Sequence, residues 1–284
     1  MYLHPLLALV LCHALIGVSV GRVSAQVFTR AVEPAVALSL GGANVAHSTL
    51  SAGIAHAAQL DGSERSGFFA STALPYGIAG WKTVRFQGFM SGGNSAAFGL
   101  DIAHGGTEGY TEQTLQVLYG RRMGKRWSLG LQAGMARVAA QEYGSAAAPT
   151  YGVSARVQML PRLSLAASVQ NPLPPRLAGT DLPAVLRIGA AWWASPIFVL
   201  LSEVEKDIER PTQVKAGLEY RPAASALYVR AGIRAGQAGR AALGLGLRLK
   251  SGLHLDVASE WHPSLGLTPA AMVSWRKARA GLAD

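Results

Sequence analysis

Charge and cysteine are both scarce in this sequence. Acidic and basic residues together make up 15% of the 284 residues, whereas they make up about 25% of an ordinary soluble domain. Cys12 is the only cysteine, so the chain cannot form an internal disulfide and must be stabilised by its sheet. The formal net charge of +10 is dispersed along the chain, which argues against a nucleic-acid-binding protein.

Long apolar runs are missing from residue 26 onward. A membrane-spanning helix needs about 20 consecutive apolar residues, and the best candidate, residues 188–201, is interrupted by Ser195 and Pro196. Because proline ends or kinks a helix, the sequence argues against a helical membrane protein.

The one long apolar run lies near the N-terminus, at residues 6–20, and is followed by the small residues Val23-Ser24-Ala25. This order is typical of a secretory signal peptide, so we expect residues 1–25 to be removed by cleavage after Ala25. A buried N-terminal helix is the alternative. Lipid attachment at Cys12 is not expected, because Leu11 is too large for the position before such a cysteine.

Glycine and alternating apolar residues are abundant. Half of the residues are hydrophobic and 33 are glycine. Between residues 240 and 262, apolar residues alternate with polar or small ones at the period of a β-strand. A turn centred on Ser251 would place Leu249 opposite Leu253 and Arg248 opposite His254, as in an antiparallel hairpin. One face of this hairpin then carries the leucines, and the other carries His254, Asp256, Glu260 and His262.

The same alternation recurs through residues 67–276 and divides this region into about fourteen strands. Tight connections alternate with longer ones, the longer ones including residues 104–109, 141–149 and 171–183. An even number of alternating strands with short turns at one edge is typical of an antiparallel transmembrane β-barrel. We therefore predict an all-β, about 14-stranded antiparallel transmembrane barrel. A secreted or periplasmic β-sandwich binding protein is the alternative, because its strands alternate too.

Three short motifs accompany the strands. Gly41-Gly42-Ala43-Asn44-Val45-Ala46 and Ser51-Ala52-Gly53-Ile54-Ala55 precede them, and His262-Pro263-Ser264-Leu265-Gly266 comes before the last one. In this order the motifs resemble those of the FadL-like outer-membrane barrels, and within that group the PorV/PorQ-type proteins. Leu50 and Ser51 stand where that family usually has Asn-Pro.

The resemblance implies a hatch, or plug, inside the barrel. Residues 26–65 would then form the N-terminal segment and plug, residues 66–278 the barrel and residues 279–284 a C-terminal tail, and a short helix is expected at residues 49–60. The plug residues implied by the motifs are Gly41, Gly42, Asn44, Ser51, Ala52 and Gly53.

The resemblance also implies a function and a location. The protein would lie in the bacterial outer membrane, in contact with its lipid and lipopolysaccharide. It would act as a channel for hydrophobic small molecules or as an accessory to type IX protein secretion, with components of that system as partners.

Charged residues on the strands would face the lumen if the apolar residues face lipid. They are Arg156, Arg187, Lys215, Arg230, Arg234 and Arg248, opposed by Glu219, Asp256 and Glu260, and we expect Arg248 and Asp256 to pair diagonally across the hairpin. Two interpretations remain open. The charges could hydrate the lumen and tie the wall to the plug, or a basic lumen could bind an anionic head group such as a carboxylate or a phosphate.

Catalytic and metal-binding patterns are missing from the strands. His254 and His262 share a face but are about 26 Å apart along a strand at 3.3 Å per residue, too far to share a metal, and Ser259 faces away from both. No glycine-rich loop leads from a strand into a helix, as a nucleotide site requires. We therefore expect neither enzymatic activity nor a cofactor.

Overall fold

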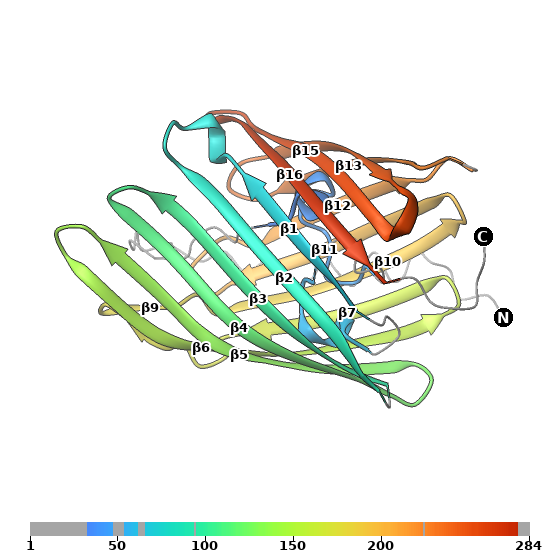
Figure 1. The fold of residues 1–284 in the computed structure, drawn as a ribbon, viewed down its shortest axis with the longest axis horizontal. Coiled ribbons are helices and arrows are strands. Elements are labelled where there is room, and N and C mark those ends of the chain that lie inside the picture. The colour runs from blue at the N-terminus through green and yellow to red at the C-terminus, as the bar shows by residue number, and fades with distance from the viewer. Residues whose placement is uncertain (1–32, 48–53, 62–65, 94, 224, 278–284) are drawn as a thin grey trace.

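The computed structural model describes residues 33–47, 54–61, 66–93, 95–223 and 225–277, and its main feature is a closed antiparallel barrel of fourteen strands (Figure 1). Consecutive strands are neighbours throughout, and β1 pairs with β16 to close the barrel. The wall strands are β1 Ser66–Ala73, β2 Lys82–Gly93, β3 Ala96–Thr107, β4 Tyr110–Met123, β5 Trp127–Ala140, β6 Gly144–Leu160, β7 Leu163–Gln170, β10 Val185–Ser195, β11 Phe198–Asp207, β12 Gln213–Tyr220, β13 Leu227–Ala235, β14 Arg240–Arg248, β15 Leu253–His262 and β16 Gly266–Arg276. The predicted fold class is confirmed.

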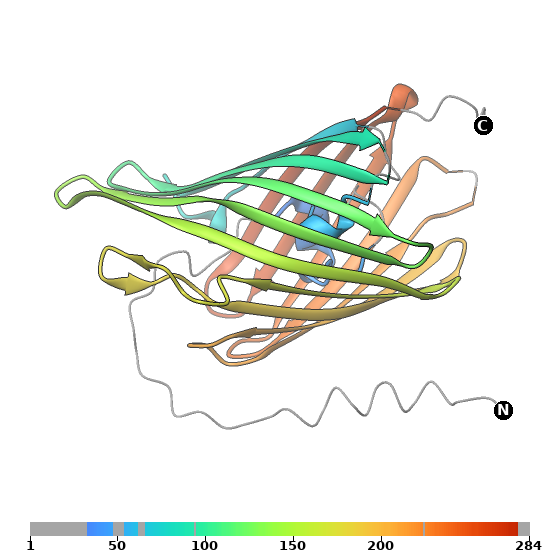
Figure 2. The same cartoon turned by 90° about the horizontal axis from the view of Figure 1, so that it is seen from below.

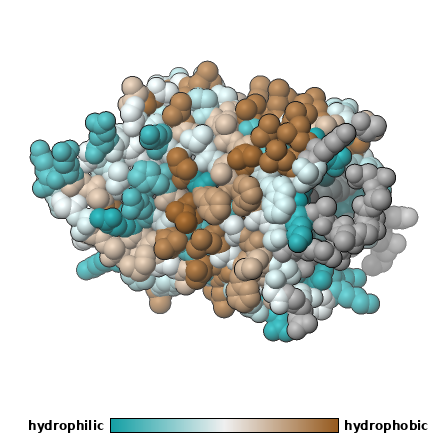
Figure 3. Space-filling model, in the orientation of Figure 1, coloured by the Kyte–Doolittle hydropathy of each residue, from teal (hydrophilic) through white to brown (hydrophobic). Residues whose placement is uncertain are grey.

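The alternation of apolar and polar residues sets the two faces of the wall. In the hairpin of β14 and β15, Leu243, Leu245 and Val257 are 68%, 50% and 57% exposed on the outside, whereas Asp256 and Glu260 are buried in the lumen. Large apolar side chains gather over the middle of the outer face in Figure 3. An apolar outer face and a polar interior are what a barrel in a bilayer requires. None of the helices in the described part of the chain has the length and apolar character that crossing a bilayer requires.

The predicted register of this hairpin is confirmed. Arg248 lies opposite His254, and the backbone N–H of Leu249 donates to the carbonyl of Leu253. Ser251 sits in the turn with a φ of 65°, a left-handed conformation that a non-glycine residue rarely adopts.

Two of the connections predicted to be long are tight turns. Strands β3 and β4 pair as far as Thr107 and Tyr110, and β5 and β6 pair as far as Ala140 and Gly144. These hairpins project beyond the rest of the barrel in Figures 1 and 2. Pro149 is accommodated because β6 pairs with β7 only from Gly152 onward, which leaves the preceding residues at a sheet edge, where proline is tolerated.

The connection between β7 and β10 folds back over the lumen. It contains the two-stranded hairpin of β8 Arg176–Leu177 and β9 Thr180–Asp181. Leu177 and Leu182 are buried in one apolar cluster with Ala136, Val138 and Ala148 of β5 and β6. We call residues 171–184 the inner loop, because it narrows this end of the barrel from inside.

The described N-terminal residues, 33–47 and 54–61, lie inside the barrel (Figure 2). Helix α2, Ala35–Ser39, packs mainly on β13 to β15, and the short 3-10 helix η3, Ala57–Gln59, packs on β4 to β6. Almost every residue of these two segments is buried. We call them the plug.

The helix expected at residues 49–60 is wrong for its described part, which holds only η3. The backbone of Ile54 bonds to the side chain of Gln87, and the backbone N–H of Ala55 donates to Gln59 Oε1. Side chains therefore use the groups that a helix would have bonded internally. Ser51, Ala52 and Gly53 lie outside the described residues.

Candidate functional site

Lumen-facing glycines provide the surface on which the plug lies. A Cβ atom at Gly232 would lie 2.1 Å from the backbone N of Gly41, and one at Gly130 would lie 2.1 Å from the backbone N of Ala58. Contacts this short do not occur, so only glycine lets the plug backbone approach the wall here. The glycines in such contact with the plug are Gly99, Gly120, Gly130, Gly189, Gly217, Gly232 and Gly244.

Polar side chains of the wall bind the plug backbone between these glycines. Ser71 Oγ accepts a hydrogen bond from the backbone N–H of Ala35 at 3.0 Å, and Ser154 Oγ accepts one from Ala58 at 3.0 Å. Gln87 both accepts from and donates to the backbone of Ile54, at 2.9 and 2.8 Å. The buried plug backbone thus has the partners that a buried polar group needs.

The first glycine motif of the sequence lies at an ionic contact with the wall. Glu203 Oε2 accepts hydrogen bonds from the backbone N–H groups of Asn44 and Val45 at 3.0 and 2.9 Å, while Oε1 lies 2.9 Å from Lys215 Nζ. Gly41 and Gly42, with φ values of 65° and 79°, form the left-handed turn just before Asn44. The predicted plug residues Gly41, Gly42 and Asn44 therefore lie together against the wall.

Lys215 belongs to a row of alternating charges that crosses the neighbouring strands β10, β11 and β12 on the lumenal face. Its Nζ lies 2.8 Å from Glu205 Oε2, which also accepts a hydrogen bond from Arg187 Nε at 2.7 Å. Each charge in this row touches its opposite, which is the arrangement that makes buried charge tolerable.

Arg234 binds the start of the plug. Its guanidinium donates to both carboxylate oxygens of Glu33, at 2.8 and 2.6 Å, and to the carbonyl of Gly41 at 3.2 Å. Burial alone would raise the pKa of Glu33, but the positive charges of Arg234 and Lys215 outweigh it and lower that pKa below its ordinary value. Glu33 is therefore held as a carboxylate, and the contact is a charged pair.

His56 is another titratable group buried within the plug. Its Nε2 lies 2.7 Å from the carbonyl of Val45, so this nitrogen carries the proton. Burial, together with the nearby charges of Arg156 and Arg187, lowers the pKa of His56 to about 4. The docked plug therefore keeps a neutral histidine that ties its two segments together.

The predicted pair of Arg248 and Asp256 is wrong. Asp256 lies opposite Gly246, and its Oδ1 accepts a hydrogen bond from Nη1 of Arg230, on strand β13, at 2.7 Å. A Cβ at Gly246 would lie 2.8 Å from that Nη1, so it is the missing side chain that lets Arg230 reach across β14. Arg248 is exposed at the end of the strand.

The other predicted lumenal charges also have partners of opposite sign. Arg230 Nε lies 2.6 Å from Glu219, and Arg156 Nη1 lies 3.9 Å from Asp61 of the plug. Glu260 lies between Arg234 and Arg240, at 3.8 and 3.4 Å. These contacts favour the first interpretation, in which the lumenal charges tie the wall to the plug. Binding of an anionic head group stays a prediction.

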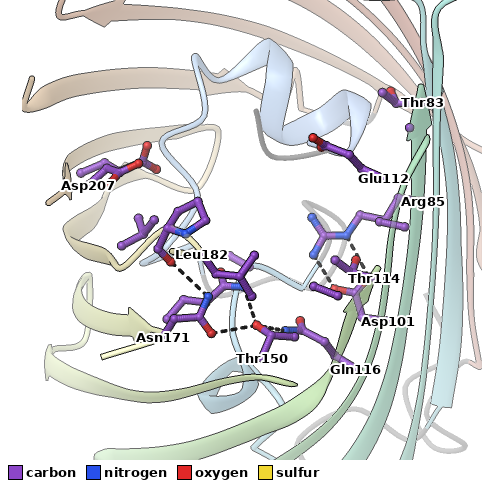
Figure 4. Close-up of a pocket in the computed structure, with 18 of the residues that line it drawn as sticks. Thr83, Arg85, Asp101, Glu112, Thr114, Gln116, Thr150, Asn171, Leu182 and Asp207 are labelled. Atoms are coloured by element: carbon purple, nitrogen blue, oxygen red, sulfur yellow. Dashed lines mark hydrogen bonds and ion pairs between the residues drawn. The ribbon is translucent and has the colours of Figure 1, made fainter. Parts of the chain in front are cut away.

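A cavity of about 230 Å³ lies between the plug and the end of the barrel at which β5 and β6 project. Ile54 and Ala55 of the plug form part of its lining, and Leu182 and Pro183 of the inner loop form another part. Figure 4 shows Arg85 and Asp101 pointing toward one another on one side of this cavity, where Nε and Oδ1 are 2.9 Å apart.

A chain of neutral hydrogen bonds lines the cavity between the wall and the inner loop (Figure 4). Gln116 Nε2 donates to Thr150 Oγ1 at 3.3 Å, Thr150 Oγ1 donates to Asn171 Oδ1 at 2.9 Å, and Asn171 Nδ2 donates to the carbonyl of Pro183 at 3.1 Å. Asn171 has a φ of 48°, which asparagine tolerates better than most residues. This side chain therefore fastens both ends of the inner loop.

Sequence reasoning missed this cavity. Its residues come from separate strands and from a connection that was predicted only as a long loop. The sequence gives only a weak signal for it, because the connection holds three leucines, of which Leu177 and Leu182 are buried and Leu173 is exposed. Within the described ranges, no group of three or more His, Cys, Asp or Glu side chains is arranged to hold a metal ion.

The geometry defines a class: a closed fourteen-stranded barrel with an apolar outer face and an N-terminal segment in its lumen. No protein-family model and no curated protein matches the sequence. Several solved structures, in contrast, have the same fold as this chain. The Ralstonia pickettii toluene transporter TbuX superposes with a TM-score of 0.69 at 10% identity, over 86% of this chain and 98% of that one.

Two further structures agree. The Pseudomonas putida toluene transporter TodX gives a TM-score of 0.67 at 11% identity, over 89% of this chain and 100% of that one. A Pseudomonas aeruginosa FadL homologue gives 0.64 at 11% identity, over 86% and 98%. The chain shares the fold of these FadL-type barrels.

Proposed function

We propose that this protein is an outer-membrane channel that carries small, largely hydrophobic organic molecules through its lumen. The observation that carries the proposal is the position of the cavity, which lies inside a barrel with an apolar outer face and ends on plug residues Ile54 and Ala55. A ligand in the cavity would touch the element that blocks its further passage. Two of the solved structures with the same fold are toluene transporters, which supports this assignment.

Passage through the lumen requires the plug to move. The plug is held by separate polar contacts to Ser71, Gln87, Ser154, Glu203 and Arg234. Each such contact contributes only about 0.5–3 kcal/mol. A ligand releases a plug segment only to the extent that it binds the released form more tightly than the docked form. A preference of about a thousandfold corresponds to about 4 kcal/mol, which exceeds any one of these contacts.

The narrower resemblance to PorV/PorQ-type proteins, with an accessory role in type IX secretion, stays a prediction from the sequence motifs. It requires a protein partner, and co-purification from native membranes is the measurement that tests it. The similar solved structures are channels, so the transport role is the one that we develop.

Two measurements test the proposal. Membrane fractionation followed by gel electrophoresis of unboiled and boiled samples should place the protein in the outer membrane and show the band shift of a closed barrel. Liposomes containing the purified protein should then take up a neutral ring compound that crosses a bare bilayer slowly, such as phenyl glucoside, faster than empty liposomes. A soluble protein without a band shift would contradict the barrel, and equal uptake by both kinds of liposome would contradict the channel.

A further inference from the structure

The cavity has a polar lining, which a pure hydrocarbon does not match. Arg85, Asp101, Gln116, Thr150 and Asn171 all contribute to it, beside apolar side chains such as Leu118 and Leu182. A hydrocarbon that fills this space would strip water from polar groups without replacing the lost hydrogen bonds, which costs free energy for each group left without a partner.

Charges of both signs line the cavity in nearly equal numbers, and most of them are paired with one another. Three arginines and four carboxylates line the cavity. Arg85 pairs with Asp101 through two hydrogen bonds, and Arg187 pairs with Glu205 at 2.7 Å. An ion that entered would meet side chains of both signs, each already engaged, so it would lose its hydration without gaining a dedicated counter-charge.

Neutral polar side chains of the lining can form hydrogen bonds with a ligand. Gln213 lines the cavity, and its Oε1, which is buried without a hydrogen-bond partner in the described part of the chain, would reach a ligand there by rotation of the side-chain amide. A buried acceptor without a partner costs free energy until a donor reaches it. Thr114 and Gln132 also line the cavity with a hydroxyl and an amide that can bond to a ligand.

We propose that the cavity binds a small neutral molecule with an apolar body and hydrogen-bond donors, such as a hydroxylated or amide-bearing ring compound, in preference to the bare hydrocarbon or to an ion of the same size. The apolar body would lie against Leu118, Leu182 and Ile54, and the donors would meet Gln213 and the neutral groups near Thr114. This inference rests on the proposed function and names the class of substrate for that channel.

A series of ligands with one skeleton tests the inference. Toluene, benzyl alcohol, benzoate and benzylammonium share a ring and differ in the polar group. Binding to the full-length protein in detergent is measured by calorimetry, with the signal of empty micelles subtracted. We expect benzyl alcohol to bind about tenfold more tightly than the other three, since one hydrogen bond is worth up to a tenfold change in affinity.

Single substitutions in the lining test whether the preference for benzyl alcohol comes from this cavity. Gln213→Leu and Thr114→Val remove hydrogen-bonding groups at nearly constant volume, and each should weaken benzyl alcohol about three- to tenfold while leaving toluene unchanged or tighter. Gln158→Leu is the control, because Gln158 bonds to the carbonyls of Leu160 and Leu163 at the other end of the barrel. The band shift on boiling verifies that each variant forms a barrel.

The outcomes separate this inference from the proposed function. Toluene that binds as tightly as benzyl alcohol to the parent protein, with uptake into liposomes intact, overturns the inference and leaves the channel standing. Preference for benzoate or benzylammonium also overturns it. Failure of all four compounds to bind, together with no uptake into liposomes, removes both.

Discussion

Asn44 of the plug donates its backbone N–H to Oε2 of Glu203 on strand β11 over 3.0 Å. The same oxygen accepts from Val45, and the other oxygen of Glu203 binds Lys215. One buried carboxylate thus joins the glycine motif of the plug to the charged row of the wall. Single substitutions at this contact can therefore test how strongly the wall binds the plug.

Glu203→Gln should loosen the plug while keeping the shape of the side chain. The amide bonds the backbone of Asn44 and Val45 more weakly than a carboxylate does, and Lys215 keeps only Glu205 as an ionic partner. We expect the docking of residues 44–47 to lose about 1–3 kcal/mol, seen as faster hydrogen exchange at these amides. Glu112→Gln is the control, because Glu112 accepts a hydrogen bond from the hydroxyl of Tyr110 on its own strand, at 2.6 Å. Equal exchange in both variants would contradict the assigned role of Glu203.

Gly232→Val should expel the first plug segment without opening the barrel. The new side chain would occupy the space now filled by the backbone of Leu40 and Gly41, and backbone cannot yield as a flexible side chain does. We expect protease cleavage within residues 33–47 and an unchanged band shift on boiling. Gly88→Ala is the matched control, because a Cβ there would meet only the Phe86 ring at 3.5 Å. A plug that stays protected in Gly232→Val would show that the glycine contact is dispensable.

Acidification should weaken plug docking through His56. Its pKa is about 4 in the docked plug and 6.5 when exposed, so between these pH values the released plug binds a proton that the docked plug does not. Docking is therefore strongest above pH 6.5 and weakens as the pH falls, by about 3 kcal/mol once pH 4 is reached. Glu33 adds a loss only below its ordinary pKa of 4.5.

Hydrogen exchange of plug amides at several pH values, corrected for intrinsic rates, measures this effect. His56→Gln keeps a donor for the carbonyl of Val45 and removes the titration. The parent protein should loosen between pH 6.5 and 4.5, whereas His56→Gln should be flat over this range. The same pH dependence in both proteins would assign the effect to another group.

Asn171 should control the inner loop. Asn171→Asp keeps the oxygen that accepts from Thr150 and from the backbone N–H of Tyr151. It replaces the donor to Pro183 by a carboxylate oxygen, so it loses one hydrogen bond of about 1 kcal/mol and places a negative charge beside that carbonyl. Asn171→Ala loses all three hydrogen bonds and also strains the backbone at a φ of 48°. We expect single-channel noise, or uptake into liposomes, to rise in the order parent, Asp variant, Ala variant. An unchanged signal in the Ala variant would mean that the loop is held by Leu177 and Leu182 alone.

Much of the wall could be predicted from the sequence. An alternation of apolar and polar residues with a period of two indicates a β-strand, and it also indicates which side chains face outward and which face the lumen. The leucines of β14 and the charges of β15 lie on the faces expected for them. Strand ends were harder to predict, since residues 104–109 and 141–149 form pairs that depend on the neighbouring strand and not on local turn residues. Arg230 on β13 pairs with Asp256 on β15 across the intervening strand β14, where Gly246 leaves room for it. This contact cannot be predicted from the hairpin of β14 and β15 alone.

The candidate site was the least predictable part. The seven glycines that contact the plug cannot be distinguished in the sequence from other strand glycines. The reason that each lacks a side chain is the close approach of the plug, which the sequence does not show. The cavity combines strands far apart in sequence with the inner loop, which is held by Leu177, Leu182 and the hydrogen bond from Asn171 to Pro183. Non-local contacts of this kind leave little periodic signal.

Passage past a movable plug is the central claim, and a reversible lock tests it most directly. Ala58 and Ser154 are in hydrogen-bond contact, so Ala58→Cys with Ser154→Cys, in a Cys12→Ser background, can join plug and wall by a disulfide. Uptake of a neutral ring compound that crosses a bare bilayer slowly, such as phenyl glucoside, into liposomes is then compared before and after reduction of one sample, with the single-cysteine proteins as controls. We predict low uptake when oxidised and parental uptake when reduced. Equal uptake in both states would contradict a plug that must move for molecules to pass.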